Sequence, residues 1–305
     1  MKTSWRVHAR RILGRRGVFL LRNTLSEIYF TLGLYRGSDK EGREEGVSAM
    51  VCTYNEEDWV VPSILSAKEL VDEYVVVDSS TDSTLLLVEK LRDEGLNIKI
   101  YRSPPGSLSE ARELAIRKAT YRWILHLDAD MVFFDWAPKY LRDYLSSLDN
   151  RKHYLVYWPW ILLCGDLRHT CGPEPYHIEH WMFTYSSSLK YTDLYIDGKP
   201  WDHLIAPLKI YKARLVNKPL GLHLTGVRKP ARIALKQLTY QYLHEFREAA
   251  KRGLSYEEMA KKLALKLFGT DDLDAVGKKI IEDWIKTLPL YNGEYPSVLK
   301  EYAGL

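Results

Sequence analysis

The sequence predicts an α/β fold in which a mostly parallel sheet carries helices on both faces. Two observations predict it. Short apolar runs alternate with helical segments of about 10 to 13 residues over the first half of the chain. These runs end in polar or acidic residues, and such residues commonly open a following helix. A third observation narrows the class: no Gly-x-Gly-x-x-Gly follows the first run, so the common dinucleotide-binding fingerprint is missing.

The elements of this half follow from the same pattern. Strands are expected at residues 47–53, 74–78, 98–101 and 123–132. A helix with acids in its first turn follows the first strand and runs to about residue 70. The polar run Ser79–Thr84 forms a turn that can cap the next helix, which ends near residue 94. A third helix over 109–120 buries a stripe of small and apolar side chains.

The alternation stops beyond Asp135. A helix near 138–148 leads to an aromatic run at 154–160, and then to an irregular stretch dense in His and aromatic residues. Such loops at the edge of an α/β sheet commonly shape a substrate pocket, although the rings can equally pack an antiparallel piece of sheet. From Pro230 the apolar spacing predicts helices, one of which opens at a capping box, Ser255 to Glu258.

Charge is unevenly distributed along the 305 residues. The first 22 residues hold seven basic side chains and no acid, whereas the rest of the chain has a net charge of −3. A basic arm of this kind favours an anionic partner, either a membrane or a nucleic acid. Residues 1–36 are expected to form one or two helices that lie on a membrane surface, with Phe19, Leu20 and Leu21 inserted; a plain docking helix is the alternative. No run of 18 uncharged apolar residues predicts a membrane span.

Three cysteines, Cys52, Cys164 and Cys171, show neither a disulfide framework nor the spacing of metal ligands. The expectation is therefore that the chain carries no disulfide and works in a reducing compartment.

The motif Asp128-Ala129-Asp130 ends the fourth apolar run. On an extended strand end, residues two apart point to the same side. Two carboxylates on one side, at the edge where α/β sheets bind ligands, predict a site for Mg²⁺ or Mn²⁺. The alternative is that the motif only opens a loop and caps the next helix.

Four motifs in register resemble the nucleotide-sugar half of family 2 glycosyltransferases, which have the Rossmann-like GT-A fold. They follow the successive predicted strands over residues 47 to about 134: Thr53-Tyr54-Asn55-Glu56-Glu57, then Asp78 with its Ser/Thr turn, then Ala111-Arg112 and finally the Asp-Ala-Asp motif. The resemblance implies an inverting, metal-dependent transferase that uses a nucleotide-sugar. It also implies that Asp78 and Glu56 contact the base and ribose, that Arg112 lies near the nucleotide, and that Asp128 contacts ribose or metal. Asp130 would hold the metal, together with a late histidine, here His223.

The sequence departs from the family pattern in three places. The turn after Asp78 is one residue shorter and lacks its glycine, and Glu113 stands where asparagine is common. The usual Glu-Asp base motif is absent, so Asp202, in Trp201-Asp202-His203, is the candidate general base and Glu179 is the runner-up. If the acceptor is a lipid phosphate it needs no base, and three cations after His223 would hold it: Arg228, Lys229 and Arg232.

The resemblance to polyprenyl-phosphate mannose synthases and to archaeal membrane-associated glycosyltransferases favours GDP-mannose as donor, with a UDP-sugar as the alternative. The acceptor would be a lipid-linked sugar or glycan, and the chain would be peripheral on the cytoplasmic face of the cell membrane. No nucleic-acid partner is expected, because no recognition motif accompanies the basic arm. A nucleotidyltransferase and an inactive scaffold are the other readings, and the sequence leaves open whether the chain forms a homodimer.

The predicted organisation has three parts. Residues 1–45 form the basic, membrane-associating segment and linker. Residues 46–228 form the GT-A domain, with a nucleotide-sugar half at 46–134 and an acceptor half at 135–228. Residues 229–305 form a helical region.

Overall fold

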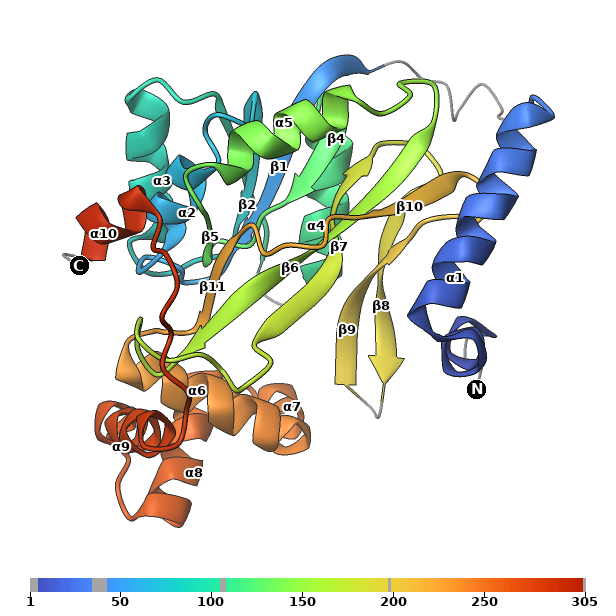
Figure 1. Ribbon diagram of the computed structural model, residues 1–305. Coiled ribbons are helices and arrows are strands. Elements are labelled where there is room, and N and C mark those ends of the chain that lie inside the picture. Colours follow the sequence, from blue (N-terminus) through green and yellow to red (C-terminus); the bar gives the residue numbers. More distant parts are fainter. Residues whose placement is uncertain (1–4, 35–42, 105–107, 197–198, 304–305) are drawn as a thin grey trace. The chain divides into compact units, whose positions relative to one another are not determined.

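The computed structural model describes residues 5–34, 43–104, 108–196 and 199–303 (Figure 1). The chain divides into two compact units. The first comprises Met1–Ala129, Asp135–Pro159 and Ile178–Leu220. The second comprises Asp130–Phe134, Trp160–His177 and Gly221–Leu305.

The first unit is built around a mostly parallel sheet. Its helices are α1 (Trp5–Thr31), α2 (Val60–Ser66), α3 (Thr84–Asp93), α4 (Leu108–Lys118) and α5 (Ala137–Ser146). Its first strands are β1 (Glu44–Thr53), β2 (Glu73–Asp78), β3 (Ile98–Arg102) and β4 (Tyr121–His126). They lie in the order β3-β2-β1-β4, all parallel, so the predicted βαβ half is confirmed.

Antiparallel and edge strands extend this unit. β7 (Tyr176–Thr184) pairs antiparallel with β4, and β10 (Tyr211–Leu215) pairs parallel with the first part of β6 (His153–Cys164). The strands β8 (Lys190–Ile196) and β9 (Lys199–Ile205) form a separate hairpin. The aromatic stretch therefore packs in part as antiparallel sheet, as one of the two expectations had it. Met50, Ile124 and Phe183 belong to the core that joins these strands to α4.

Helix α1 lies beside β10 (Figure 1). Gly14 has a positive φ of 64° and interrupts the helix with a kink. Beyond the kink, the Asn23 Oδ1 atom accepts a hydrogen bond from the Ala213 backbone N–H (2.7 Å), and the Ser26 hydroxyl donates one to the Ile210 carbonyl (2.9 Å). These contacts fix α1 on the body of the first unit. Residues 1–4 and 35–36 of the predicted membrane-binding segment lie outside the described residues.

The second unit combines a small piece of sheet with a helical cluster. Its strands are β5 (Met131–Phe133), the last residues of β6 and β11 (Gly221–Gly226). Its helices are α6 (Pro230–Gln241), α7 (Leu243–Lys251), α8 (Tyr256–Phe268), α9 (Leu273–Ile285) and α10 (Ser297–Ala303). The predicted capping box is confirmed, because Ser255 and Glu258 exchange both hydrogen bonds at the start of α8. A Cβ on Gly277 would lie 1.8 Å from the Pro230 carbonyl oxygen, so α9 can approach α6 this closely only at a glycine.

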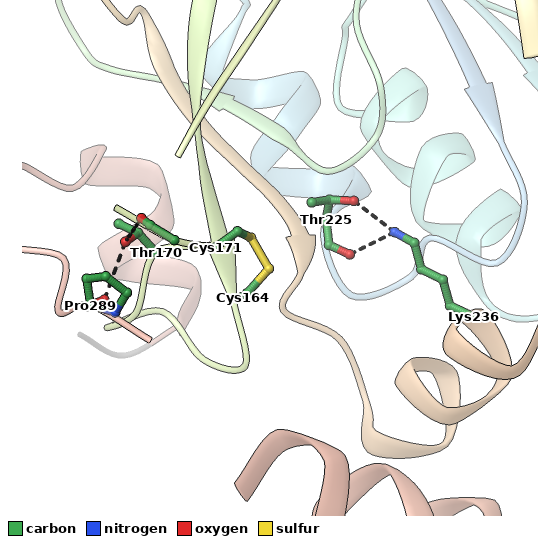
Figure 2. The surroundings of a disulfide bond; sticks show 7 residues. Cys164, Thr170, Cys171, Thr225, Lys236 and Pro289 are labelled. Carbon is green, nitrogen blue, oxygen red and sulfur yellow. Dashed lines mark hydrogen bonds between the residues drawn. A yellow bond between two sulfur atoms is a disulfide. The ribbon is translucent and has the colours of Figure 1, made fainter. Parts of the chain in front are cut away.

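The expectation that the chain carries no disulfide is wrong. Cys164 and Cys171 are bonded across seven positions, with their Cα atoms 4.9 Å apart (Figure 2). The turn between them reverses the chain, since the Cys164 N–H donates to the His169 carbonyl (3.0 Å). Short-range geometry, not a framework of several bridges, brings the two sulfurs together. The cysteine pattern therefore no longer supports a reducing compartment.

The predicted strand over 123–132 is also corrected. β4 ends at His126, and β5 begins at Met131. Asp128, Ala129 and Asp130 lie between them, in a segment that is not extended strand. The alternation argument for two carboxylates on one side of a strand therefore does not apply.

Candidate functional site

The loops after β1 and β2 are joined by hydrogen bonds. Asn55 adopts a positive φ of 57°, which asparagine tolerates better than most residues. Its backbone N–H donates to the Ser80 hydroxyl (2.8 Å), and its side-chain oxygen accepts from the Thr81 N–H (2.8 Å). The Glu56 N–H donates to the Thr84 hydroxyl (2.7 Å). The two polar motifs thus form one structure at the carboxyl ends of neighbouring parallel strands.

Asp78 lies at the end of β2 and is fully buried. The Thr53 hydroxyl donates to its carboxylate (2.6 Å), and the Arg102 guanidinium forms an ion pair with it. Arg102 is a site residue that the sequence argument missed. The sequence indicated Arg102 only by its position at the end of β3. In the parallel pair of β2 and β3, it is the register partner of Asp78.

Arg112 joins two carboxylates in the first unit. Its side chain is 7% exposed, and its guanidinium donates to the Asp128 carboxylate (2.8 Å) and forms an ion pair with Asp202 of β9. Two sequence-predicted residues that are 74 positions apart in the chain, Asp128 and Asp202, are therefore bound to the same cation. Ser109, one turn earlier on α4, donates to Asp193 of β8 (2.6 Å), so the β8–β9 hairpin is fastened to α4 at two points.

His126 is a second residue that the sequence argument missed. Its Nε2 atom lies 3.0 Å from Asp128 Oδ1, and its ring packs edge-on against Trp181. Burial, and next the charge of Arg112, lower the pKa of His126 to about 4. The imidazole is therefore neutral at pH 7, and its Nε2–H donates to the Asp128 carboxylate. The only feature of the sequence that could have indicated a role for His126 is that it is a histidine within an apolar run.

Asp130, in the second unit, contacts a histidine and an arginine. His223 Nε2 lies 3.1 Å from Asp130 Oδ1, and the Arg228 guanidinium donates to Oδ2 at 2.6 Å. All three side chains are at least 90% buried. The Leu224 N–H donates to the Asp130 carbonyl (2.8 Å), which fixes the backbone of this residue against β11. Asp130 and His223, with 92 positions between them in the chain, are thus in contact, and their role as metal ligands stays a prediction.

The residues at Asp130 fit a divalent cation as a partial ligand set. No group of three or more His, Cys, Asp or Glu side chains in the described segments could hold a metal by itself. The 3.1 Å between Asp130 Oδ1 and His223 Nε2 is, however, close to the roughly 3 Å between adjacent ligands of an octahedral ion about 2.1 Å from each. A neutral histidine and a carboxylate also suit Mn²⁺. Substrate phosphates and water commonly supply the other ligands of such ions.

The remaining predicted residues occupy separate positions. Glu179 on β7 pairs with its neighbour His180 (3.0 Å) and is partly exposed. Lys229 is exposed and precedes α6, and Arg232 lies in the first turn of that helix. Tyr54 is about half exposed beside the loops after β1 and β2.

Comparison with known proteins identifies part of the chain. Residues 48–168 match the family model described as glycosyl transferase family 2. An uncharacterized glycosyltransferase of Rickettsia conorii is 36% identical over 117 residues, which cover 37% of this chain and 38% of that protein. A poly-β-1,6-N-acetyl-D-glucosamine synthase of Staphylococcus aureus is 26% identical over 113 residues, or 36% of this chain and 26% of the synthase. The matched segments thus span well under half the length of these relatives.

Among solved structures, the mannosyltransferase PcManGT of Pyrobaculum calidifontis, in complex with GDP-Man and Mn²⁺, aligns with 94% of this chain and 91% of its own. Its identity is 14% and the TM-score is 0.41. TarS of S. aureus with UDP is 27% identical over 39% of this chain and 36% of its own, with a TM-score of 0.33.

The matched segment, 48–168, contains the four motifs from which the resemblance was drawn. It also contains β2, β3, β4, most of β1 and the helices α2 to α4, so the predicted GT-A type of α/β fold is confirmed. Residues 48–168 therefore form a domain of glycosyl transferase family 2.

Proposed function

We propose that the chain is a metal-dependent, inverting glycosyltransferase that moves a hexose from a nucleotide-sugar to a lipid-linked or glycan acceptor at a membrane surface. The observation that carries the proposal is the buried Asp130–His223 pair, 3.1 Å apart, within a family 2 chain. The favoured donor is GDP-mannose.

The nucleoside of the donor is assigned to the first unit. Asp78, Glu56 and the loop around Asn55 lie at the ends of β1 and β2, where α/β sheets bind ligands. Arg112 and Asp128 supply a fixed cation and a carboxylate acceptor for phosphate and ribose. The neutral His126 holds Asp128 in place through its Nε2–H.

Asp130 and His223 would hold the divalent cation, which when bound neutralises the charge that develops on the departing diphosphate. Arg228, bonded to the same carboxylate, orients Asp130.

Asp202 is the proposed general base. It removes the proton from the acceptor hydroxyl as that oxygen attacks the anomeric carbon, and the bond between that carbon and the diphosphate oxygen breaks. Its ion pair with Arg112 holds the carboxylate against α4. Glu179 is the second candidate, because it is a partly exposed carboxylate on β7 of the same unit.

The main alternative is a polyprenyl-phosphate acceptor, whose oxygen is already anionic and needs no base. Arg228 is bound to Asp130, so Lys229 and Arg232 at the start of α6 are the better test of this case. With a hydroxyl acceptor, Asp202→Asn should lower turnover at least about a hundredfold, and Lys229→Ala with Arg232→Ala should cost much less. With a phosphate acceptor the ranking should reverse.

The proposal is tested by measuring Mn²⁺-dependent hydrolysis of, and transfer from, a panel of nucleotide-sugars. The panel contains GDP-mannose and several UDP-sugars. A donor of N-acetylglucosamine is included because one relative is a poly-β-1,6-N-acetyl-D-glucosamine synthase. Asp130→Asn and His223→Ala should abolish the metal-dependent activity, while Asp166→Asn, a partly exposed carboxylate of the same unit, should retain it. Unchanged Mn²⁺-dependent turnover in Asp130→Asn would refute the metal assignment. A chain that acts on no donor would be a scaffold, and one that releases pyrophosphate from a nucleoside triphosphate would be a nucleotidyltransferase.

A further inference from the structure

One face of α1 packs against the rest of the first unit. Phe19 packs against Tyr157 with ring centroids 4.7 Å apart, and Asn23 and Ser26 bond to backbone groups at β10. Glu27 forms ion pairs with Lys152 (3.0 Å) and with Lys212. These positions recur every three to four residues, so they mark a single side of the helix.

The other side of α1 carries large apolar side chains that the described part of the chain leaves exposed, with Thr24 and Thr31 between them. Leu20, Ile28 and Leu32 are 70%, 51% and 65% exposed, and they follow one another at multiples of four residues. Leu25 lies on the same side and is 37% exposed. This outer stripe, consisting of Leu20, Leu25, Ile28 and Leu32, runs for about three turns.

The sequence around the outer stripe carries almost only positive charge. Glu27 is the single acid among residues 1–36, and it faces the lysines of the body. Hydrogen bonds from Lys212, and then from Lys152, lower the pKa of Glu27, so the carboxylate stays ionised and the two lysines balance its charge at the docked face. Arg22 donates to the Ala206 and Pro207 carbonyls. Six further basic residues precede Gly17 in the sequence, on both sides of the kink at Gly14.

We infer that the outer stripe of α1 lies in the headgroup region of an anionic lipid membrane, with the basic segment before it on the lipid phosphates. An apolar helix face next to a basic segment without acids matches a surface that is apolar inside and negative outside. A second copy of this chain matches it less well, because two such basic segments would repel each other.

This inference corrects which side chains insert. Phe19 was expected to enter the bilayer, but it is packed on Tyr157, and Arg22 is bonded to the body and not presented to lipid. Leu20 is the one predicted residue that is strongly exposed, while Leu21 is only partly so. Ile28 and Leu32 take the place of the other two.

The test is co-sedimentation of the full chain with phosphatidylcholine vesicles, prepared with and without phosphatidylglycerol. The variant Leu20→Glu/Ile28→Glu/Leu32→Glu should reduce binding to the anionic vesicles at least tenfold, without unfolding, because the three side chains are more than half exposed. The matched control is Leu86→Glu/Leu265→Glu/Leu290→Glu, at residues 67%, 57% and 64% exposed on other elements, and it should bind like the unmodified chain. As a second measurement, a polarity-sensitive fluorophore on Ile28→Cys should report an apolar environment when vesicles are added, whereas one on Leu265→Cys should not.

The inference is overturned if the unmodified chain stays in solution with anionic vesicles, or if the α1 variant and the control bind equally. It is also overturned if light scattering shows a dimer that the α1 variant alone dissociates, because the stripe is then an interface between two copies. This inference rests on the membrane location given in the proposed function. The membrane contact and the transferase activity are tested by separate measurements, so either can be refuted without the other. Vesicle binding is measured without a donor, and donor hydrolysis is measured without vesicles.

Discussion

Arg112 decides how the carboxylates of the first unit are held. Its guanidinium reaches Asp128, which follows β4, and Asp202, which lies on β9. Both carboxylates are mostly buried, at 29% and 23% exposed, so each depends on a nearby cation for its charge. A planar guanidinium can bind two carboxylates at once, whereas a lysine ammonium is a point charge.

Arg112→Met should therefore destabilise the chain by about 3 kcal/mol, at the low end for breaking a buried ion pair, because the carboxylates keep some contact with water. Arg112→Lys should recover only part of this loss. Urea unfolding measures both. The control is Arg117→Met on the same helix, whose side chain is 37% exposed and whose pairing should contribute about 1 kcal/mol or less. Equal losses at the two positions would contradict the assignment.

Glu73 gives the fold a pH dependence that can be measured. The residue is 1% exposed, and burial alone would raise its pKa. Hydrogen bonds from Lys99 (2.6 Å), from the Ser48 hydroxyl (2.5 Å) and from the Thr120 N–H (2.5 Å) outweigh burial and lower the pKa below 4.5.

Because the folded pKa lies below the unfolded one, the unfolded chain binds the proton first as the pH falls. The stabilisation by Glu73 is thus complete above 4.5 and is lost as the pH drops through the folded pKa. Glu73→Gln should lower stability at pH 7 and flatten its decline below pH 4.5. Urea midpoints as a function of pH test this, and an unchanged acid slope in the variant would refute it.

At the scale of elements, the disulfide closes the loop at the end of β6, and this loop is hydrogen-bonded to the segment after α9. The loop carries Thr170, whose N–H donates to the Pro289 carbonyl (2.9 Å; Figure 2). It also carries Arg168, whose carbonyl accepts from the Tyr291 N–H (2.7 Å). On β11, a Cβ at Gly226 would lie 2.5 Å from Cys164 Sγ, so only glycine fits beside the bridge.

Replacing both bridging cysteines by serine should lower the free energy of unfolding by about 2.5 kcal/mol, the loop-closure entropy for a ring of this length. Thiol reductant should destabilise the unmodified chain by a similar amount and leave the double variant unchanged. A reductant effect of equal size on both proteins would assign it to something other than this bond.

The strands show which features of the fold the sequence could predict. β2 is uniformly buried and ends in a polar turn, so its apolar run and its bounds were visible locally. The break between β4 and β5 was not, because the hydrogen bond that fixes it comes from Leu224, more than ninety residues away. The bridge was missed for a related reason: a spacing of seven suggests no pairing until Gly165, at φ 84°, turns the chain back.

The candidate site was predicted unevenly for the same reason. Family motifs located Thr53, Asp78, Arg112 and Asp130, and the structure gives each of them a specific partner. Arg102 and His126 were missed because each acts through register or burial, which a motif does not encode. Whether Asp202 is the base stays a prediction.

At the scale of the whole molecule, ligand binding should appear as added stability. A donor at a hundredfold excess over its Kd should stabilise the native chain by about 2.7 kcal/mol. We expect this in thermal denaturation with GDP-mannose and Mn²⁺, and only a small shift without the metal. In Asp130→Asn the shift should lose its dependence on Mn²⁺, and a dependence that persists would place the cation elsewhere.

The positive charge of the chain is concentrated near its beginning, in the segment that also carries the outer stripe of α1. Residues 1–36 carry eight basic side chains and one acid, and residues 37–305 carry 36 basic and 39 acidic ones. The excess of basic side chains, which would attract anionic lipid, thus lies in residues 1–36. Vesicle binding should therefore weaken as salt is raised, since screening acts on exposed charges of this kind.

Two hydrogen bonds, from the Ala213 N–H to Asn23 Oδ1 and from the Ser26 hydroxyl to the Ile210 carbonyl, have a consequence for solubility. β10 pairs with β6 on one side, so its other side would present open backbone groups, and such an edge recruits strands from other molecules. The amide and hydroxyl side chains of α1 occupy that position instead. A variant that lacks residues 1–34 is therefore expected to self-associate in plain buffer, with larger species in size-exclusion chromatography, whether or not lipid is present.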